Sequence, residues 1–200
     1  MKYSSMRNCL FFFIAFFFIP CNAQKRDIDS YVLKADQLIG EGRYDKAIIL
    51  LSEIEDEILS LKNDTVEANF NFIYATACIM TGKTERCISL YQKTLSLYKK
   101  IGYNGTNVFL SLSELGNIYL KNEDFKESEK FFRKAIISCY SYFLLEEDNP
   151  ICLNTLLFSY ASLAEVYTNL NENKLAEECV QKYKQLEKYI SETEWANHTL

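Results

Sequence analysis

Residues 112–136 read LSELGNIYLKNEDFKESEKFFRKAI, and this stretch decides the fold. Apolar residues lie at helical intervals on both sides of the polar segment Asn122-Glu123-Asp124, which favours two helices joined by a short turn. Gly116 lies inside the first of these helices, where a small residue lets two antiparallel helices approach closely. The stretch therefore predicts a helix hairpin whose helices cross at Gly116.

Small residues hold the same place in three further segments of the chain. They are Ala35, Ala75 and Ala164, and successive crossing residues are separated by 40, 41 and 48 positions. The first of these segments has a turn signature in Gly42-Arg43-Tyr44. Self-similarity at such a period indicates one hairpin repeated four times.

The repeated unit resembles the tetratricopeptide repeat, whose pattern is W-x2-L-G-x2-Y followed by A-x3-F. In the clearest copy Leu115, Gly116 and Tyr119 match this pattern, whereas Leu112 stands for the tryptophan and Ser128 for the alanine. The resemblance implies an all-α, right-handed superhelical solenoid of about four helix hairpins. It also implies protein or peptide binding as the general function, without naming a partner.

The resemblance covers nearly all of residues 24–200, and it predicts eight helices. The usual repeat has 34 residues, so the surplus here is assigned to longer second helices. Asp64 to Glu67 resembles a capping box, and Asn149 with Pro150 is expected to cap and begin the fourth repeat. The predicted repeats span approximately 28–62, 65–100, 106–145 and 150–195.

The first 23 residues have the pattern of a secretory signal peptide. Lys2 and Arg7 precede a short apolar run, and the small-residue sequence Cys21-Asn22-Ala23 predicts cleavage before Gln24. Lipidation at Cys21 and an uncleaved anchor are the two alternatives, both of which would associate the chain with a membrane. The phenylalanine-rich leader also resembles those of exported proteins of Bacteroides-type bacteria, so we expect a periplasmic or secreted location.

The charge of the chain argues against nucleic-acid binding. The formal net charge is −5, and it becomes about −7 once Lys2 and Arg7 leave with the leader. Proteins that bind the phosphate backbone need a basic surface. We therefore expect no nucleic-acid partner.

Five cysteines follow the leader: Cys78, Cys87, Cys139, Cys152 and Cys179. The odd number leaves at least one of them without a partner in the same chain. Cys78 and Cys87 are interpreted as buried free thiols, because they replace residues of the repeat core. Cys139 and Cys152 flank the third connection between repeats and are the pair that a disulfide would join, if the chain has one.

The sequence gives little basis for catalysis. Its single histidine, His198, lies near the C-terminus, so neither a Ser/His nor a Cys/His mechanism has a credible base. The sequence also has no glycine-rich phosphate loop and no pattern of metal ligands. We therefore expect a non-enzymatic protein without cofactor or metal.

The resemblance also implies which residues would contact a ligand. In the family, the first helices of the hairpins line a concave groove, and two positions of each helix commonly contact ligand. The hypothesis is that Phe72 anchors a bound segment and that Asn117 bonds its backbone; the alternative is that some of these side chains pack against the next hairpin. The predicted ligand contacts are Val32, Asp36, Phe72, Thr76, Ser113, Asn117, Ala161 and Glu165.

The last predicted helix carries Leu186, Tyr189, Ile190 and Trp195 to near the C-terminus. A solenoid normally ends in a polar cap, so these residues predict either a capping helix or contact with a partner or a second copy of the chain. The function expected first is a scaffold or adaptor in the bacterial envelope that binds a protein segment. The alternatives are a truncated sensory repeat region of a signalling protein and an envelope binder of small molecules or glycans.

Overall fold

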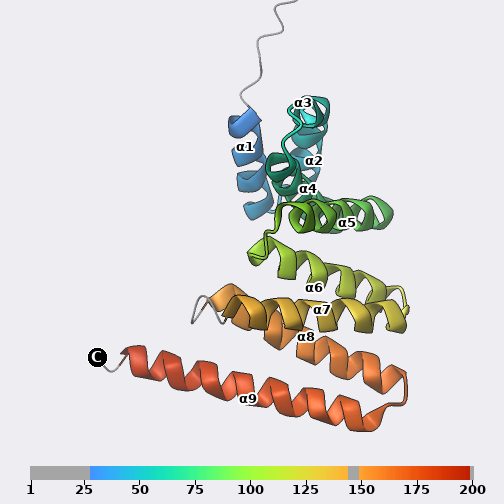
Figure 1. Cartoon of the computed structure of the whole chain (residues 1–200), viewed down its shortest axis with the longest axis vertical. Coiled ribbons are helices and arrows are strands. Elements are labelled where there is room, and N and C mark those ends of the chain that lie inside the picture. The colour runs from blue at the N-terminus through green and yellow to red at the C-terminus, as the bar shows by residue number, and fades with distance from the viewer. Residues whose placement is uncertain (1–27, 144–148, 199–200) are drawn as a thin grey trace, which may run out of the picture.

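The computed structural model describes residues 28–143 and 149–198, with side chains as far as Glu192. In these residues the backbone forms α-helices and no strand, and the helices stack as successive hairpins from α1 at one end to α9 at the other (Figure 1). The prediction of an all-α solenoid of helix hairpins is confirmed. The predicted signal peptide 1–23, Cys21 and the side chain of Trp195 lie outside the described residues.

Four hairpins account for the described helices. The first pairs α1 (Ile28–Gly40) with α2 (Tyr44–Ser52) and α3 (Glu55–Ser60); the second is α4 (Asp64–Ile79) with α5 (Thr84–Ile101); the third is α6 (Thr106–Lys121) with α7 (Phe125–Phe143); and the fourth is α8 (Pro150–Asn169) with α9 (Asn173–His198).

The first hairpin corrects one expectation, because its second helix is split into α2 and α3. Ile54, between them, leaves the helical region with φ −112° and ψ 1°. Ile54 and Ile58 nevertheless both remain buried, so the split helix still contributes to the core. The described chain therefore has nine helices where eight were expected.

All four hairpin turns have a left-handed residue at the same position relative to the crossing residue. The residue seven positions after each crossing residue has a positive φ: 72° at Gly42, 73° at Gly82, 60° at Glu123 and 61° at Asn171. A left-handed residue after a helix lets the next N–H return to the helix end, as it does from Asp124 to the Tyr119 carbonyl at 2.9 Å. The extra residues of the repeats therefore lie outside these turns. They lengthen second helices such as α5, with 18 residues, and α7, with 19, as predicted.

The helix caps differ in one case from those predicted. The cap of α4 is Asn63 and not Asp64, because the Asn63 side chain accepts hydrogen bonds from two backbone N–H groups of the first turn, at 3.1 and 3.2 Å. Asn149 caps α8 in the same way, at 3.0 and 3.1 Å, and Pro150 begins that helix, as predicted. Both caps satisfy N–H groups that the helix itself cannot bond.

The crossing residues explain why the helices of each hairpin lie so close together. Ala35, Ala75 and Gly116 are buried. A Cβ atom on Gly116 would lie 2.9 Å from carbon atoms of the Phe132 ring, so this site has no room for a larger residue. Ala164 is only half-buried, because no described hairpin follows the fourth one.

The five cysteines of the described residues are buried free thiols. Cys152 donates a hydrogen bond from Sγ to the Cys139 carbonyl at 3.4 Å, and the disulfide considered for this pair is not formed. Burial raises the pKa of Cys87 to about 12 and also raises that of Cys139. A neutral thiol is a poor nucleophile, so these residues serve as small core side chains.

Asn71 is a weak point of the core. It lies on α4 at the place that Leu112 takes on α6, and it is only 3% exposed. No partner among the described residues bonds its Nδ2 group. We expect Asn71→Leu to raise the free energy of unfolding by about 1–3 kcal/mol, because it removes an unsatisfied buried amide. Urea unfolding of this variant, beside the exposed-site control Asn154→Leu, would measure the change; a loss of stability would contradict it.

Candidate binding groove

The first helices of the first three hairpins enclose an open pocket of about 470 Å³. Its wall is largely apolar, because α1 and α4 turn aliphatic and aromatic side chains toward it. These include Ile28, Val32, Leu33, Val66, Phe72 and Ile73. The polar lining consists of Asp29 and Asp36 from α1, Asn69 from α4 and Asn107 from α6. A pocket with apolar walls and a few polar groups has the composition typical of a binding site.

A buried tyrosine holds the two amides of the pocket in place. The Tyr98 hydroxyl, on α5, donates to Asn69 Oδ1 and accepts from Asn107 Nδ2 at 2.9 Å. Because burial raises its pKa, Tyr98 keeps its proton and can act as this donor. Asn69 Nδ2 and Asn107 Oδ1 are then left without a partner in the described chain. A donor and an acceptor on one surface are what the backbone of an extended peptide requires.

Three of the predicted ligand contacts meet in this pocket: Val32, Asp36 and Phe72. The Phe72 ring is half-buried and meets the Tyr91 ring edge-on, with 6.2 Å between the centroids. Thr76 lies one turn further along α4. Its hydroxyl donates to the Phe72 carbonyl at 3.0 Å and lies 3.4 Å from the Tyr91 hydroxyl.

The predicted contacts on α6 need a correction. Ser113 is only 4% exposed, so the expectation that it lies on the surface is wrong. Glu114, the next residue, is partly exposed and accepts a hydrogen bond from Asn117, but it does not line the pocket between α1, α4 and α6. Burial raises the pKa of Glu114, while the Asn117 hydrogen bond and the Lys121 charge oppose this shift.

The contacts predicted on α8 do not join the pocket. Ala161 and Glu165 are exposed, and Glu165 lies in a separate hollow between α8 and α9, together with Thr168 and Lys184. This hollow is where the fourth hairpin would meet another one. Six of its nine lining residues have polar side chains, as is expected of the polar end of a solenoid. The eight predicted contacts thus do not form one site.

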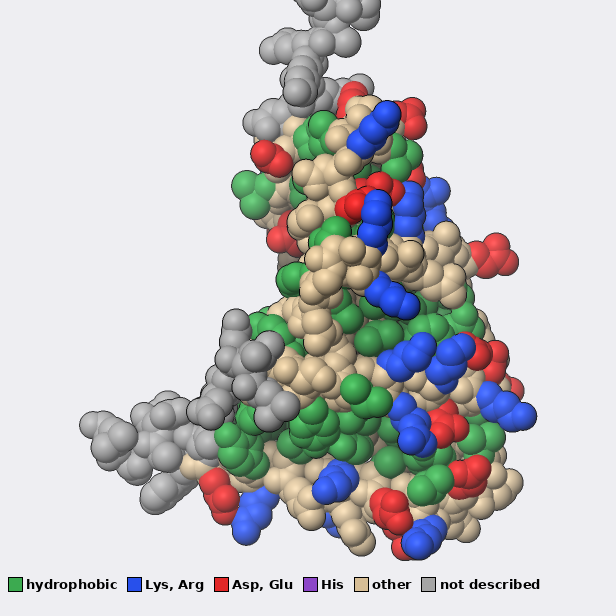
Figure 2. Space-filling model, viewed as in Figure 1, with side chains coloured by type: hydrophobic (Ala, Val, Ile, Leu, Met, Phe, Trp, Pro, Cys, Tyr) green, Lys and Arg blue, Asp and Glu red, His purple; other side chains and the backbone are tan. Residues whose placement is uncertain are grey.

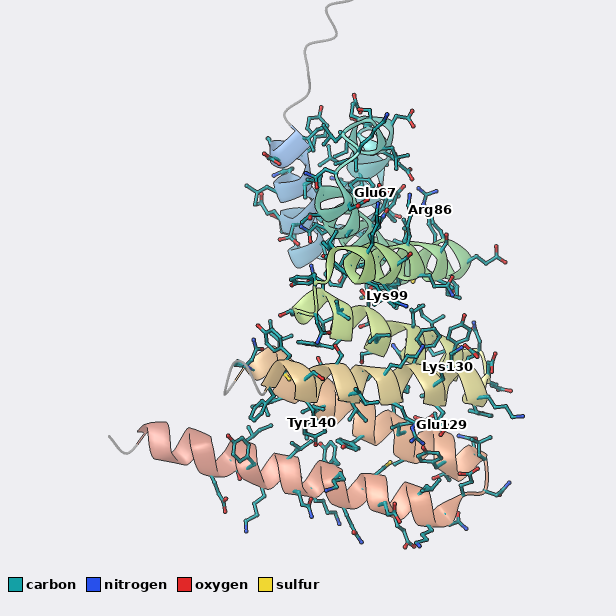
Figure 3. The ribbon with its side chains drawn as sticks, viewed as in Figure 1. Glu67, Arg86, Lys99, Glu129, Lys130 and Tyr140 are labelled. Atoms are coloured by element: carbon teal, nitrogen blue, oxygen red, sulfur yellow. The ribbon has the colours of Figure 1, made fainter. Side chains whose placement is uncertain are left out.

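A second hollow, of about 360 Å³, lies between α7 and α9, over α8. Figure 2, viewed with α7 in front of α8, shows hydrophobic side chains at this level. Ile137 is 65% exposed there, and the hydroxyls of Tyr140 and Tyr160 lie 3.3 Å apart. Tyr140 and Glu129 both project from α7 (Figure 3), and Glu129 accepts a hydrogen bond from Tyr167 at 2.9 Å. None of the predicted ligand contacts lines this hollow.

The last helix closes the fourth hairpin. Leu186 of α9 is half-buried and packs against the cluster shared by the third and fourth hairpins, whereas Tyr189 is 39% exposed. The packing of Leu186 fits the predicted capping helix. Contact of this helix with a second copy of the chain stays a prediction.

The described residues contain no group of three or more histidine, cysteine or acidic residues arranged to hold a metal ion. None of the helices in the described ranges combines the length and the apolar character that crossing a membrane requires.

Comparison with known proteins supports the repeat. The family model described as tetratricopeptide repeat matches residues 111–136, which contain the stretch that predicted the hairpin. No curated protein matches the chain. A crystal structure of the nearly identical TPR-like repeats of a Podosopora anserina kinesin light chain has 14% identity, covers 82% of this chain and 96% of its own, and gives a TM-score of 0.54.

A second solved structure, BtubC (BKLC) from P. vanneervenii, has 15% identity and a TM-score of 0.48, with coverage of 82% of this chain and 81% of its own. At these identities, the likeness to the Podosopora anserina repeats concerns the fold alone. The chain thus has a tetratricopeptide-like helical repeat fold.

Proposed function

We propose that this chain, a solenoid of tetratricopeptide-type hairpins, is a non-enzymatic adaptor that holds a segment of a partner protein in the pocket between α1, α4 and α6. The observation that carries the proposal is the combination found there. Apolar walls offer contacts for side chains, while Asn69 and Asn107 present one donor and one acceptor, fixed by the buried Tyr98. Recognition of backbone and side chains together suits a peptide segment.

The proposed place of action is the bacterial envelope. The support is the leader pattern at residues 1–23, with its basic start, short apolar run and small residues before Gln24. Lipidation at Cys21 or retention of the leader would keep the adaptor at a membrane. Cell fractionation with detection of the mature N-terminus would distinguish these outcomes.

The proposal predicts that a partner is lost when the pocket changes. Leu33→Asp is the main variant, because Leu33 lines the pocket and is 71% exposed, so its replacement leaves the core intact. Phe72→Asp is a second variant on α4. Ile137→Asp is the matched control: Ile137 is 65% exposed but lies on α7, in the other hollow.

The measurement is affinity capture from the native envelope, identified by mass spectrometry, with circular dichroism to check folding. We expect Leu33→Asp and Phe72→Asp to lose a protein that the wild type and Ile137→Asp both capture. Loss with Ile137→Asp alone would move the interface to the hollow between α7 and α9. Capture of no protein by the wild type would contradict the adaptor function and favour a small-molecule binder.

A further inference from the structure

We propose that the segment bound in this pocket is cationic, with an apolar side chain placed between two basic ones that face Asp29 and Asp36. This inference rests on the proposed function and specifies the chemistry of the partner. It follows from the charges that line the pocket, from the ion pairs of neighbouring carboxylates and from the placement of the nearest basic residues.

Asp29 and Asp36 are the charged residues that line the pocket in the described structure, and no lysine, arginine or histidine of the described residues joins them there. They lie seven residues apart on α1, about 10.5 Å along the helix axis. Val32 and Leu33, between them, belong to the apolar wall. The pocket thus presents negative charge on both sides of an apolar centre.

Two carboxylates of α4 that lie outside the pocket have partners among the described residues, whereas Asp29 and Asp36 have none there. Glu67 and Asp64 of α4 pair with Lys93 and Lys100 of α5, each at 2.6 Å. Asp29 and Asp36 are exposed and form no ion pair with a described residue. Their charges are therefore available to a bound partner.

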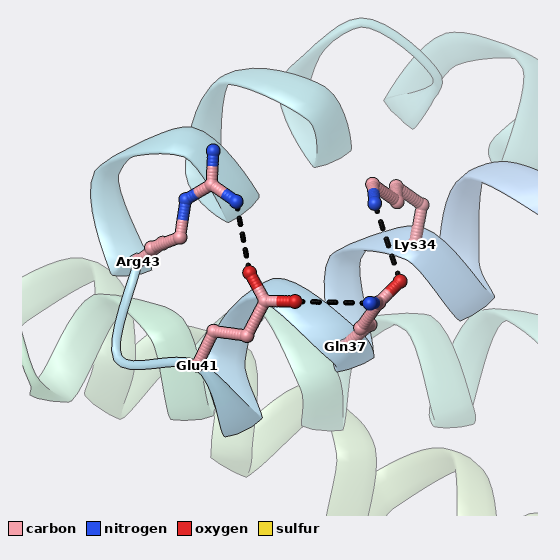
Figure 4. Close-up of polar contacts among 4 residues, drawn as sticks. All are labelled: Lys34, Gln37, Glu41 and Arg43. Carbon is pink, nitrogen blue, oxygen red and sulfur yellow. Dashed lines mark hydrogen bonds and ion pairs between the residues drawn. The ribbon is translucent and has the colours of Figure 1, made fainter.

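The nearest basic residues of the described chain, Lys34 and Arg43, are occupied on another face of the first hairpin. Lys34 donates to Gln37 at 3.2 Å, Gln37 donates to Glu41 at 2.9 Å, and Arg43 pairs with Glu41 at 2.8 Å. Figure 4 shows this chain of contacts along α1 and its turn. None of these four residues lines the pocket, so Lys34 and Arg43 do not directly neutralise the negative charge of Asp29 and Asp36.

The backbone chemistry of the pocket sets the form of the segment. A helix uses its own backbone groups, whereas the groups left open on Asn69 and Asn107 suit an extended chain. In an extended chain, alternate residues face the same side, and each residue adds about 3.3 Å to the length of the chain. Lysines four positions apart, with leucine midway, then span about 13 Å, and flexible lysine side chains can reach both aspartates from that distance.

The test uses labelled peptides and the whole chain. Fluorescence anisotropy would measure binding of the peptide KSLSKSLSK and of its acidic counterpart ESLSESLSE. The double variant Asp29→Asn/Asp36→Asn removes the charges of the pocket without changing the size of the side chains. The control Asp56→Asn/Glu85→Gln removes two exposed charges from α3 and α5, where neither residue lines the pocket or pairs with a described residue.

We expect the basic peptide to bind the wild type and the control equally, and the Asp29→Asn/Asp36→Asn variant about three- to tenfold more weakly. This loss should shrink at high salt, because salt screens exposed charges. The acidic peptide should bind none of them. Equal binding of both peptides, an unchanged affinity in the double variant, or no binding of the basic peptide at about 1 mM would overturn the inference.

The inference and the proposed function can fail separately. If Leu33→Asp loses the captured protein but the charge variant retains it, the pocket binds a protein segment that is not selected by charge. If the wild type captures no protein, the proposed function itself is wrong, and the inference is overturned with it.

Discussion

Gly116→Leu is expected to lower the free energy of unfolding by about 3 kcal/mol or more. Even a Cβ atom at this site would lie 2.9 Å from the ring of Phe132, which is fully buried. Neither the ring nor the α6 backbone can move away without opening the third hairpin. The carbonyl of Gly116 also accepts a hydrogen bond from Ser128 at 2.9 Å, which a widened crossing would break. Chemical unfolding followed by circular dichroism would measure the loss.

Gly40→Leu is the matched control for this prediction. Gly40 also lies in a first helix, at the end of α1, but a Cβ atom there would meet nothing within 4 Å. We expect no loss of stability at this site, since leucine favours a helix more than glycine does. The smaller change Gly116→Ala should be partly rescued by Phe132→Leu, which frees space at the crossing. A stability of Gly116→Leu equal to that of the wild type would show that the helices do not cross at Gly116.

Phe132→Ala is expected to cost about 3–5 kcal/mol, the usual range for removing a large buried ring. Phe132 has no exposed surface, fills the crossing at Gly116 and meets the ring of Phe158 on α8 edge-on, with 5.9 Å between the centroids. Its loss would therefore weaken both the third hairpin and its contact with the fourth. Thermal and urea unfolding would measure the effect.

Phe158→Ala provides the comparison, because it removes the other ring of the same pair. Phe158 is 43% exposed, so we expect its loss to cost no more than about 1.5 kcal/mol. If the two substitutions had equal effects, the stability would come from the ring contact alone and not from the burial of Phe132.

The hairpins could be predicted from the sequence because their determinants are local. A crossing residue and a turn seven positions later recur four times, and the structure gives the same turn geometry in each copy. Even Glu123 takes the left-handed conformation that glycine takes at Gly42 and Gly82. Position within the repeat therefore determined this conformation even where the residue type did not favour it.

The groove was predicted only in part, because exposure depends on how successive hairpins pack. The position three residues before the crossing residue is half-buried on α4, at Phe72, but buried on α6, at Ser113. On α8, Glu165 faces a hollow shared with α9. A single repeat pattern cannot give such differences, since they arise from contacts between repeats.

The split of the second helix at Ile54 and the choice of Asn63 as a cap were also not predicted. Both depend on single backbone positions, where neighbouring residues offered an equally good pattern: the apolar spacing continued through Ile54, and Asp64 could have served as a cap. The boundaries of helices are less strongly specified by sequence than the helices themselves.

Site-specific photocrosslinking tests most directly the claim that the pocket between α1, α4 and α6 holds a protein segment. A photoreactive phenylalanine would replace Leu33 in the pocket or, in a separate strain, Ile137 on α7, and both would be irradiated in intact cells. The account predicts a discrete crosslinked protein at position 33 and none at position 137. Crosslinking at position 137 alone, or at neither position, would contradict it.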